Sequence, residues 1–271
     1  MERIAEILNA SRKIVLKIGS NVLSDGDGRV DQQNVKNIAE QVHFLMDRGK
    51  QVLIVSSGAG ICGVGAINKW ARRDDINYKQ ALCAIGQVEL MLGYKKFLNE
   101  RRIHVAQMLL TNEDFSDNNR ILHIRNTLFT LLDEGVVPII NENDSVSVEE
   151  IEMGDNDMLA ARTAELWDAD VLVLMSDIDG IYDKSPKEYE DARLIREVYD
   201  LGELESSIDM GPKSSFGTGG IGSKIEAARL MGRYSIPTIL LNGRNGGALM
   251  RALSERIDAT LFHGAALSST R

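Results

Sequence analysis

Residues 217–224, Gly-Thr-Gly-Gly-Ile-Gly-Ser-Lys, combine a flexible turn with a lysine in a way that suits phosphate binding. A glycine-rich turn at the start of a helix leaves backbone amides free to hold an anion, and the ammonium group of Lys224 adds a positive charge. Four glycines within six residues favour this interpretation over an ordinary turn before a capped helix. The run is not a Walker A motif, because it ends in Ser-Lys and no strand leads into it.

Lys17 is a second candidate for contact with an anion. It lies in the apolar strand expected at 14–18 and is followed by Gly19 and Ser20. A lysine inside an apolar strand costs free energy unless an anion meets it or its stem reaches water at the edge of the sheet. The residues alone leave both interpretations open.

Acidic and amide side chains gather in two further segments. The first is Asn-Glu-Asn-Asp at 141–144, and the second is Gly-Asp-Asn-Asp at 154–157. One of residues 155–157 is expected to cap a helix. An EF-hand is excluded, because Ala160 and Leu166 stand where that calcium loop needs Gly and Glu. Together the two segments suit a cationic group such as an amine, with the remaining acids able to orient lysines.

Two more polar segments leave expected strands. Gly58, Gly60 and Gly63 match the G-x-G-x-x-G pattern of dinucleotide-binding proteins, but no acidic residue ends a second strand about 20 positions later. A dehydrogenase is therefore disfavoured. Residues 176–182, Ser-Asp-Ile-Asp-Gly-Ile-Tyr, suit either a simple turn or the binding of a nucleobase or ribose, and the sequence does not decide between them.

Alternating apolar segments predict the elements that carry these residues. Short apolar runs predict strands, and apolar residues at helical spacing predict the helices between them. Strands are expected at 14–18, 51–56, 105–110, 136–140, 171–175, 238–242 and 260–262, and helices at 31–49, 78–101, 118–133, 157–167, 222–233 and 247–256. Residues 185–215 are weakly patterned and are expected to form a mobile excursion. This order predicts an α/β fold, a three-layer αβα sandwich with a mainly parallel central sheet.

Composition excludes several classes of protein. The chain has 271 residues, a formal net charge of −9, a sequence pI near 5.1 and 44% hydrophobic residues. We expect a single folded domain, 1–271, that binds no nucleic acid. Cys62 and Cys83 are too few for a disulfide framework or a structural zinc site, and the four histidines show no metal-ligand spacing. Since no apolar run is long enough for a membrane span, a cytoplasmic location without membrane contact is expected.

The ordered set of segments resembles the amino acid kinase superfamily, and within it the glutamate 5-kinase family, over nearly the whole chain. The resemblance is carried by KIGSNVL, VSSGAG, AIGQ, QMLLTNEDF, NTLFTLLDEGVVPIINENDSV, EMGDNDMLAA, LMSDIDGIYDKSP and GTGGIGSK. NEND and GDND are the most specific pair, because aspartokinases, acetylglutamate kinases and uridylate kinases share the sandwich and the lysines but not this loop. Two positions depart from the family pattern, which commonly has Ile at Gly60 and Ser-Thr-Lys at 222–224.

The resemblance implies ATP-dependent phosphorylation of the γ-carboxylate of L-glutamate to glutamyl 5-phosphate, the first step of proline biosynthesis. It implies that Lys17 and Lys224 flank the transferring phosphoryl group and that Asp157 orients them. Glutamate would be held by Ser57, Asp144 and Asn156, with Asp155 beside the substrate loop. ATP would be held by Lys17, Ser176, Asp177, Thr218, Gly219, Gly220, Ile221, Gly222, Ser223 and Lys224. The part of the chain at roughly 1–165 would then serve glutamate, and 166–271 would serve ATP.

The resemblance also sets expectations for cofactors and partners. Mg²⁺ is expected to bind through ATP phosphates and water rather than in a protein cage. Feedback inhibition by proline and a homodimer or homotetramer are expected because the family shows them. Many relatives append a PUA domain, for which this chain ends too soon, so RNA binding is not implied. The alternatives are a kinase of this fold that acts on aspartate, acetylglutamate or UMP, and a non-catalytic sensor of small molecules.

Overall fold

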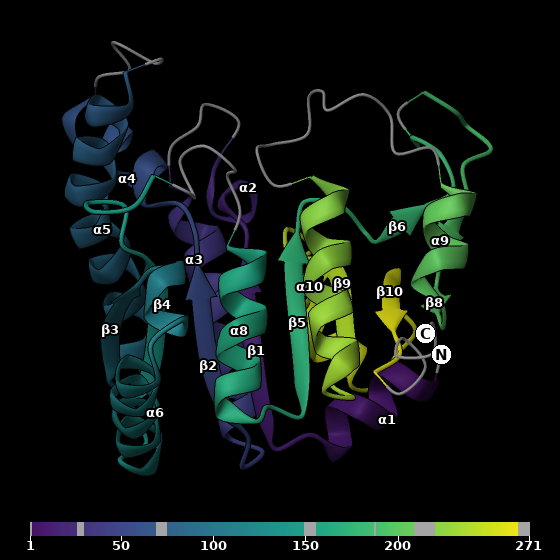
Figure 1. Cartoon of the computed structure of the whole chain (residues 1–271), viewed down its shortest axis with the longest axis horizontal. Helices are drawn as coiled ribbons and strands as arrows, with labels where there is room; N and C mark the ends of the chain where they lie inside the picture. Colours follow the sequence, from purple (N-terminus) through teal and green to yellow (C-terminus); the bar gives the residue numbers. More distant parts are fainter. Residues whose placement is uncertain are drawn as a thin grey trace.

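An eight-stranded sheet forms the centre of the computed structural model, which describes residues 2–25, 30–68, 75–148, 156–186, 188–208 and 220–264 (Figure 1). The strand order is β3-β4-β2-β1-β5-β9-β10-β8. The strands are β1 Lys13–Ile18, β2 Gln51–Ser56, β3 Val105–Leu110, β4 Val137–Glu142, β5 Val171–Ser176, β8 Glu197–Val198, β9 Thr238–Asn242 and β10 Ala259–Phe262. Every neighbouring pair is parallel except β9 with β10. The predicted mainly parallel central sheet is therefore confirmed.

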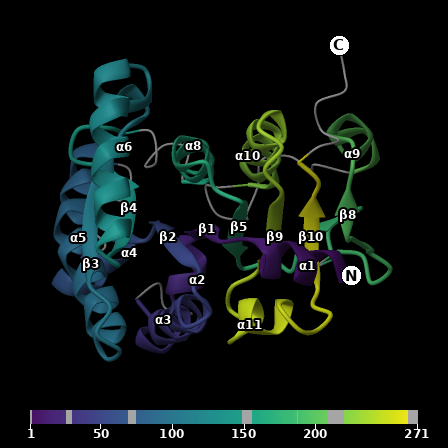
Figure 2. The same ribbon diagram turned by 90° about the horizontal axis from the view of Figure 1, so that it is seen from below.

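Helices cover both faces of this sheet (Figure 2). One face shares its core with α1 Glu2–Ala10, α3 Gln32–Met46, α5 Ile76–Asn99 and α11 Ala248–Ala252. The other face shares its core with α6 Asn118–Asp133, α8 Asp157–Trp167, α9 Leu201–Ser207 and α10 Ile221–Arg233. The three-layer sandwich is thus confirmed. Within the described ranges, no helix is both long enough and apolar enough to cross a bilayer.

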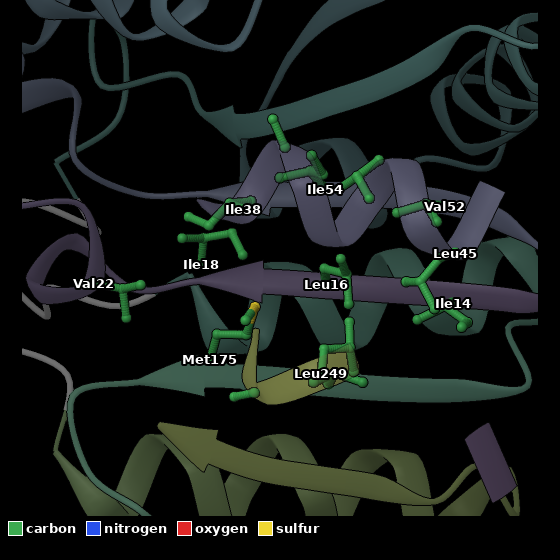
Figure 3. Close-up of a cluster of buried hydrophobic side chains, with 14 of the residues drawn as sticks. Ile14, Leu16, Ile18, Val22, Ile38, Leu45, Val52, Ile54, Met175 and Leu249 are labelled. Carbon is green, nitrogen blue, oxygen red and sulfur yellow. The ribbon is translucent and has the colours of Figure 1, made fainter. Parts of the chain in front are cut away.

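Alternation along β1 decides which layer each of its side chains faces. Ile14, Leu16 and Ile18 are buried in the core shared with α3 and α11, as Figure 3 shows. Val15 belongs to the opposite core, which contains α8 and α10. Because successive side chains of a strand point to opposite faces, Lys17 lies on the same face as Val15. The strand therefore directs its lysine towards the layer that holds α8 and α10.

Several predicted elements have the predicted bounds, and three segments differ from the predicted secondary structure. The helix expected at 247–256 ends at Ala252, because the chain must turn back for β10 to pair with β9. The described part of 185–215 contains α9 and two strands, β7 Leu194–Ile195 and the edge strand β8; β7 pairs with β6 Ile181–Tyr182. The segment after β2, for which no helix was expected, is the helix α4 Ala59–Ile67.

Helices α4 and α5 cross in backbone contact at two glycines. A Cβ atom on Gly63 would lie 1.9 Å from the carbonyl oxygen of Leu82, and one on Gly86 would lie 1.8 Å from that of Ala59. Neither position has room for a side chain, so α5 passes directly over the start of α4. Because α4 follows β2, this crossing holds α5 beside the carboxyl end of β2.

We expect Gly86→Ala to lower the free energy of unfolding by about 1–3 kcal/mol, because the added methyl group must push the backbone of α4 away. Gly93→Ala is the matched control on the same helix, since its Cβ would lie 3.8 Å from Cγ1 of Val35. This control should be neutral or stabilise the fold by up to about 1 kcal/mol. Urea unfolding followed by circular dichroism measures both variants, and equal effects would contradict the proposed packing.

Candidate active site

The carboxyl ends of β4, β2, β1 and β5 lie side by side in the middle of the sheet. In open parallel sheets, ligands bind just beyond these strand ends. Lys17 lies near the end of β1, Ser57 directly follows β2, and Ser176 ends β5. Residues 141–144 begin inside β4 and run past its end. The topology of the sheet therefore gathers predicted site residues that are far apart in the sequence.

A buried carboxylate holds both predicted lysines. Oδ1 of Asp157 lies 2.8 Å from Nζ of Lys17, and Oδ2 lies 3.0 Å from Nζ of Lys224. Ser223 donates a hydrogen bond of 3.0 Å to Oδ2 as well. Asp157 is 0% exposed and each lysine is 4% exposed. Two ammonium groups on one carboxylate leave a net positive charge in a site with little water, which favours the binding of an anion.

The starts of two helices position this cluster. Asp157 is the first residue of α8, where a negative charge interacts favourably with the helix dipole. Lys224 closes the first turn of α10, whose N-cap residue, Gly220, supplies no side-chain hydrogen bond. Gly220 therefore leaves the first amides of α10 without a side-chain cap of its own, and helix-start amides of this kind suit phosphate oxygens. Three predicted site residues lie outside the described residues, namely Asp155, Thr218 and Gly219.

Asn156 connects the lysine cluster with the segment at the end of β4. Its Nδ2 donates to the carbonyl oxygen of Ser56 at 2.9 Å and to Oδ1 of Asn141 at 2.7 Å. Asn141 donates in turn from Nδ2 to Oε1 of Gln87 at 2.8 Å. All four residues are buried. These bonds fix the ends of β2 and β4, the start of α8 and the middle of α5 relative to one another.

Ser57 and Asp144 carry buried polar atoms that no described residue satisfies. Oγ of Ser57 and Oδ1 of Asp144 have no hydrogen-bond partner, although the two residues are only 2% and 5% exposed. A buried polar group without a partner costs about 1–3 kcal/mol, so most have one. Two such atoms beside one network indicate a place for a polar ligand. Burial raises the pKa of the Asp144 carboxyl to about 6, and a hydrogen bond from Cys83 partly opposes that shift.

Ser176 and Asp177, which were predicted to contact ATP, lie at the end of β5 and directly after it. Oγ of Ser176 donates a hydrogen bond of 3.2 Å to Oδ1 of Asp177. Nδ2 of Asn21 donates one of 3.1 Å to Oδ2 of Asp177. Asn21 belongs to the short helix α2 Ser20–Leu23, so the neighbouring strand β1 also orients this carboxylate. Asp179 accepts a bond of 3.1 Å from Nδ2 of Asn242 at the end of β9. Neither asparagine was predicted as part of the site.

A row of polar side chains on α5 was also not predicted. Nε2 of Gln80 donates to the carbonyl oxygen of Asp144 at 2.9 Å, and the hydroxyl of Tyr94 lies 3.0 Å from Oγ of Ser56. Gln87, which contacts the Asn156 network, lies midway between them. The three residues are seven positions apart and therefore share one face of the helix. This spacing is the signal in the sequence that could have identified them.

The arrangement has two sides that meet at Asn156 and Asp157. One side presents two ammonium groups and the first amides of α10, a combination that suits phosphate oxygens. The other side presents a carboxylate and a hydroxyl, a combination that suits an amine and a polar group beside it. The geometry therefore allows a phosphorylated ligand and an amino-bearing ligand to bind next to each other.

The sequence is similar to proteins of one family. Residues 12–242 match the amino acid kinase family. The chain is 56% identical over 257 residues to a protein of Alkaliphilus oremlandii (strain OhILAs) named glutamate 5-kinase, and the match covers 95% of this chain and 98% of that relative. It is 38% identical over 291 residues to a protein of the same name from Treponema pallidum (strain Nichols), with coverage of 96% and 98%.

The structure is similar to two solved structures. UMP kinase from Ureaplasma parvum superimposes with a TM-score of 0.65 at 17% identity, covering 93% of this chain and 98% of that one. An isopentenyl phosphate kinase superimposes with a TM-score of 0.60 at 19% identity, covering 92% and 99%. At these identities the likeness concerns the fold alone, and it agrees with the sandwich described above.

Proposed function

This chain belongs to the amino acid kinase family, and from that premise we propose that it catalyses the glutamate 5-kinase reaction. The enzyme transfers the γ-phosphoryl group of ATP to the γ-carboxylate of L-glutamate, which gives ADP and glutamyl 5-phosphate. This is the first step of proline biosynthesis. The observation that carries the proposal is the buried Asp157, which holds Lys17 and Lys224 next to the Asn156 network.

The acceptor in this reaction needs no general base. The γ-carboxylate of glutamate ordinarily titrates with a pKa of about 4.3, so it is ionised at neutral pH. One of its oxygens forms a bond to the γ-phosphorus of ATP while the bond from that phosphorus to the bridging oxygen breaks. The bridging oxygen keeps the electron pair and leaves as part of ADP, and no proton is transferred. Catalysis therefore consists of aligning two anions and compensating their charge.

The lysine cluster supports this task. Lys17 and Lys224 would flank the phosphoryl group in transit and stabilise the charge on its oxygens. Asp157 would orient both ammonium groups, since each of its oxygens holds one of them. The nucleotide would also be held by Ser176, Asp177, Thr218, Gly219, Gly220, Ile221, Gly222 and Ser223. The helix-start amides of α10 support that role, because the N-cap residue Gly220 has no side chain that could cap them.

The other side of the site would bind glutamate. Asp144 would pair with the α-ammonium group, while Ser57 and Asn156 would contact the rest of the substrate, with Asp155 beside them. The buried Oγ of Ser57 and Oδ1 of Asp144 support these roles, because a ligand would supply their missing partners. This division assigns glutamate to the part of the chain at roughly 1–165 and ATP to 166–271.

Mg²⁺ would enter the site with ATP, bound to phosphate oxygens and water. When bound, the ion supplies further compensation of the phosphate charge. Lys17, Lys224 and the first amides of α10 fit such a complex, because they address phosphate oxygens rather than the metal. Among the described residues, no group of three or more His, Cys, Asp or Glu side chains could hold a metal ion by itself.

Formation of ADP with a panel of acceptors tests the proposed function. With ATP and Mg²⁺, ADP should form in the presence of L-glutamate, and hydroxylamine should trap the acyl phosphate as a hydroxamate. Turnover with aspartate, N-acetylglutamate or UMP but not with glutamate would identify another kinase of this fold. Binding of glutamate or proline without turnover would identify a non-catalytic sensor.

An exposed apolar face of α5 supports self-association as a homodimer or homotetramer. Ile85, Val88 and Leu92 are 38%, 59% and 54% exposed at a spacing that places them on one side of the helix. Leu109 on the edge strand β3 is exposed as well. Grouped apolar side chains of this kind are typical of protein interfaces. Sedimentation equilibrium would contradict this part of the proposal if the protein were a monomer at micromolar concentration.

The proposal also includes feedback inhibition by proline and a cytoplasmic location.

We expect kcat/KM for glutamate to fall as the pH drops below about 6. Burial raises the pKa of Asp144 to about 6, so this carboxylate gains a proton in that range. Protonation removes the negative charge that would bind the α-ammonium group, whereas the substrate carboxylates, whose pKa values in water are about 4.3 or lower, stay ionised. Initial rates at saturating ATP over a pH series would show the inflection of the enzyme–ATP complex to which glutamate binds.

Asp144→Asn is the control for this profile. It should remove the inflection and raise the KM for glutamate by about 10- to 100-fold, with the KM for ATP unchanged.

The contribution of Asp144 to the free energy of unfolding, measured without substrate, should fall as the pH rises, whereas kcat/KM for glutamate should rise. Because the folded-state pKa is raised, Asp144 contributes stability at pH below about 4, and this contribution is lost as the pH rises through about 6. An unchanged glutamate dependence would remove Asp144 from the site.

A further inference from the structure

Gln87, which is hydrogen-bonded to Asn141, carries a buried polar atom without a partner, as Ser57 and Asp144 do. Its Nε2 has no hydrogen-bond partner among the described residues, and the residue is only 8% exposed. An amide nitrogen carries two N–H donors and accepts nothing. The missing partner of this atom must therefore be an acceptor.

Two backbone groups determine how the side-chain amide of Gln87 is oriented, because they fix the asparagines to which it is linked. Oδ1 of Asn141 accepts from the backbone N–H of Glu142 at 3.0 Å, and only an oxygen can occupy that position. Nδ2 of Asn141 therefore faces Gln87, and the atom that it meets at 2.8 Å must be the acceptor, Oε1. The other end of the network is fixed as well, because Nδ2 of Asn156 donates to the carbonyl oxygen of Ser56. Nε2 of Gln87 is thus the atom that remains for a ligand.

The helix crossing places Gln87 close to the other substrate contacts. Gly86, the residue before it, lies against the backbone of Ala59 at the start of α4. Ala59 is two residues beyond Ser57, whose Oγ is also buried without a partner. Two helical turns earlier on α5, Gln80 contacts the backbone of Asp144, which holds the third such atom. The atoms without partners on Ser57, Gln87 and Asp144 therefore belong to one region of the molecule.

We infer that Nε2 of Gln87 donates a hydrogen bond to a carboxylate oxygen of bound glutamate, an inference that rests on the proposed function. The acceptors of glutamate at neutral pH are its two carboxylates, since its α-ammonium group can only donate. Asp144 suits that ammonium group, and Gln87 suits a carboxylate beside it. Gln87 is then a residue that selects for a substrate with a carboxylate at this position.

Gln87→Met tests the inference, because methionine has a similar length but no donor. The KM for glutamate should rise by about 10- to 150-fold, while the KM for ATP should stay within about twofold of the wild-type value. Gln41→Met is the matched control. Gln41 is also buried, but its amide is satisfied within the protein by the N–H of Leu249 and the carbonyl oxygen of Asn37. That variant should lose stability and keep both KM values.

Gln87→Glu separates contact with the substrate from support of Asn141. It keeps an acceptor for Nδ2 of Asn141 but replaces the amide donor with an ionisable oxygen. The ratio of its KM for glutamate to that of the wild type should grow as the pH rises, because ionisation places a negative charge beside the substrate carboxylate. A purely structural role would leave this ratio constant.

Four results would overturn the inference. Two concern Gln87→Met, namely a KM for glutamate within about twofold of wild type and equal changes in the KM for both substrates. The others are a KM ratio in Gln87→Glu that stays constant with pH, and failure of both Gln87 variants to fold. Each of them leaves the proposed function standing as long as the wild-type enzyme phosphorylates glutamate. If the wild type does not, the proposed function itself is wrong.

Discussion

Replacing Lys224 with alanine is expected to lower kcat by about 100- to 1,000-fold while the protein remains folded. The reason is that its ammonium group would stabilise charge on the phosphoryl group in transit. The fold should survive because Asp157 keeps Lys17 at 2.8 Å and the hydroxyl of Ser223 at 3.0 Å as partners. Steady-state kinetics and circular dichroism on the same preparation would measure both quantities. A variant that unfolds at 25 °C would instead show that Lys224 serves mainly in a structural ion pair.

Lys50 provides a matched control for that experiment, because it is also a buried lysine. It is 8% exposed, and its Nζ donates to the carbonyl oxygens of Leu8, Asn9 and Ser11 at 2.7, 3.0 and 2.7 Å. These carbonyls lie at the end of α1, so the ammonium group satisfies the acceptors that a helix leaves open there. Lys50→Met should therefore lower the free energy of unfolding by about 1–3 kcal/mol and leave kcat within about twofold of wild type.

The fold could be predicted largely because its strands and helices have distinct periodicities. The strand β2 and the helix α6 have the predicted bounds, since one is a short β-branched run and the other repeats apolar residues at helical spacing. Helix α4 was missed because its sequence, AGICGVGAI, is small and apolar on all sides and shows no amphipathic period. Its helical state depends on α5, which packs against it at Gly63 and Gly86.

Residues of the candidate site could be predicted where their burial would cost free energy unless they met a partner or ligand. A lysine in an apolar strand is such a residue, and the structure places Lys17 on a carboxylate that also holds Lys224. Gln87 and Asn21 could not be found by this criterion, because a single glutamine or asparagine is an ordinary residue on a helix. Gln87 could be found only through its seven-residue spacing from Gln80 and Tyr94. The contact of Asn21 with Asp177 depends on the fold, and the local sequence does not show it.

The glycines at positions 60 and 222, where the family commonly has larger residues, are not required by a lack of space. A Cβ atom on Gly60 would lie 3.4 Å from Sγ of Cys83, which is ordinary van der Waals contact, and one on Gly222 would meet no atom of the described residues within 4 Å. Both positions therefore have room for at least a methyl group. Neither glycine is required by a positive φ angle, because only Gly49, Gly58, Gly135 and Gly247 among the described glycines have one.

Asp157→Asn is, with Lys224→Ala, one of the two substitutions expected to have the largest effects, and it should lower both the free energy of unfolding and kcat. The substitution keeps the shape of the side chain but removes the charge that two buried ammonium groups share. Removing one partner of a buried ion pair typically lowers the free energy of unfolding by about 3–5 kcal/mol. Because the two lysines would no longer be held in place, kcat should fall by about 100-fold or more. Urea unfolding and steady-state kinetics measure these two effects.

ATP should partly reverse the loss of stability in Asp157→Asn. Its phosphates would replace the missing carboxylate as counter-ions of Lys17 and Lys224, so saturating ATP should raise the Tm of the variant by more than it raises that of the wild type. Asp170→Asn is the control, since Asp170 accepts bonds of 2.6 and 2.7 Å from the backbone amides of Arg12 and Lys13 at the opposite end of β1. It should lose stability without a larger response to ATP. If ATP raised the Tm of Asp157→Asn no more than that of the wild type, the two lysines would not be phosphate ligands.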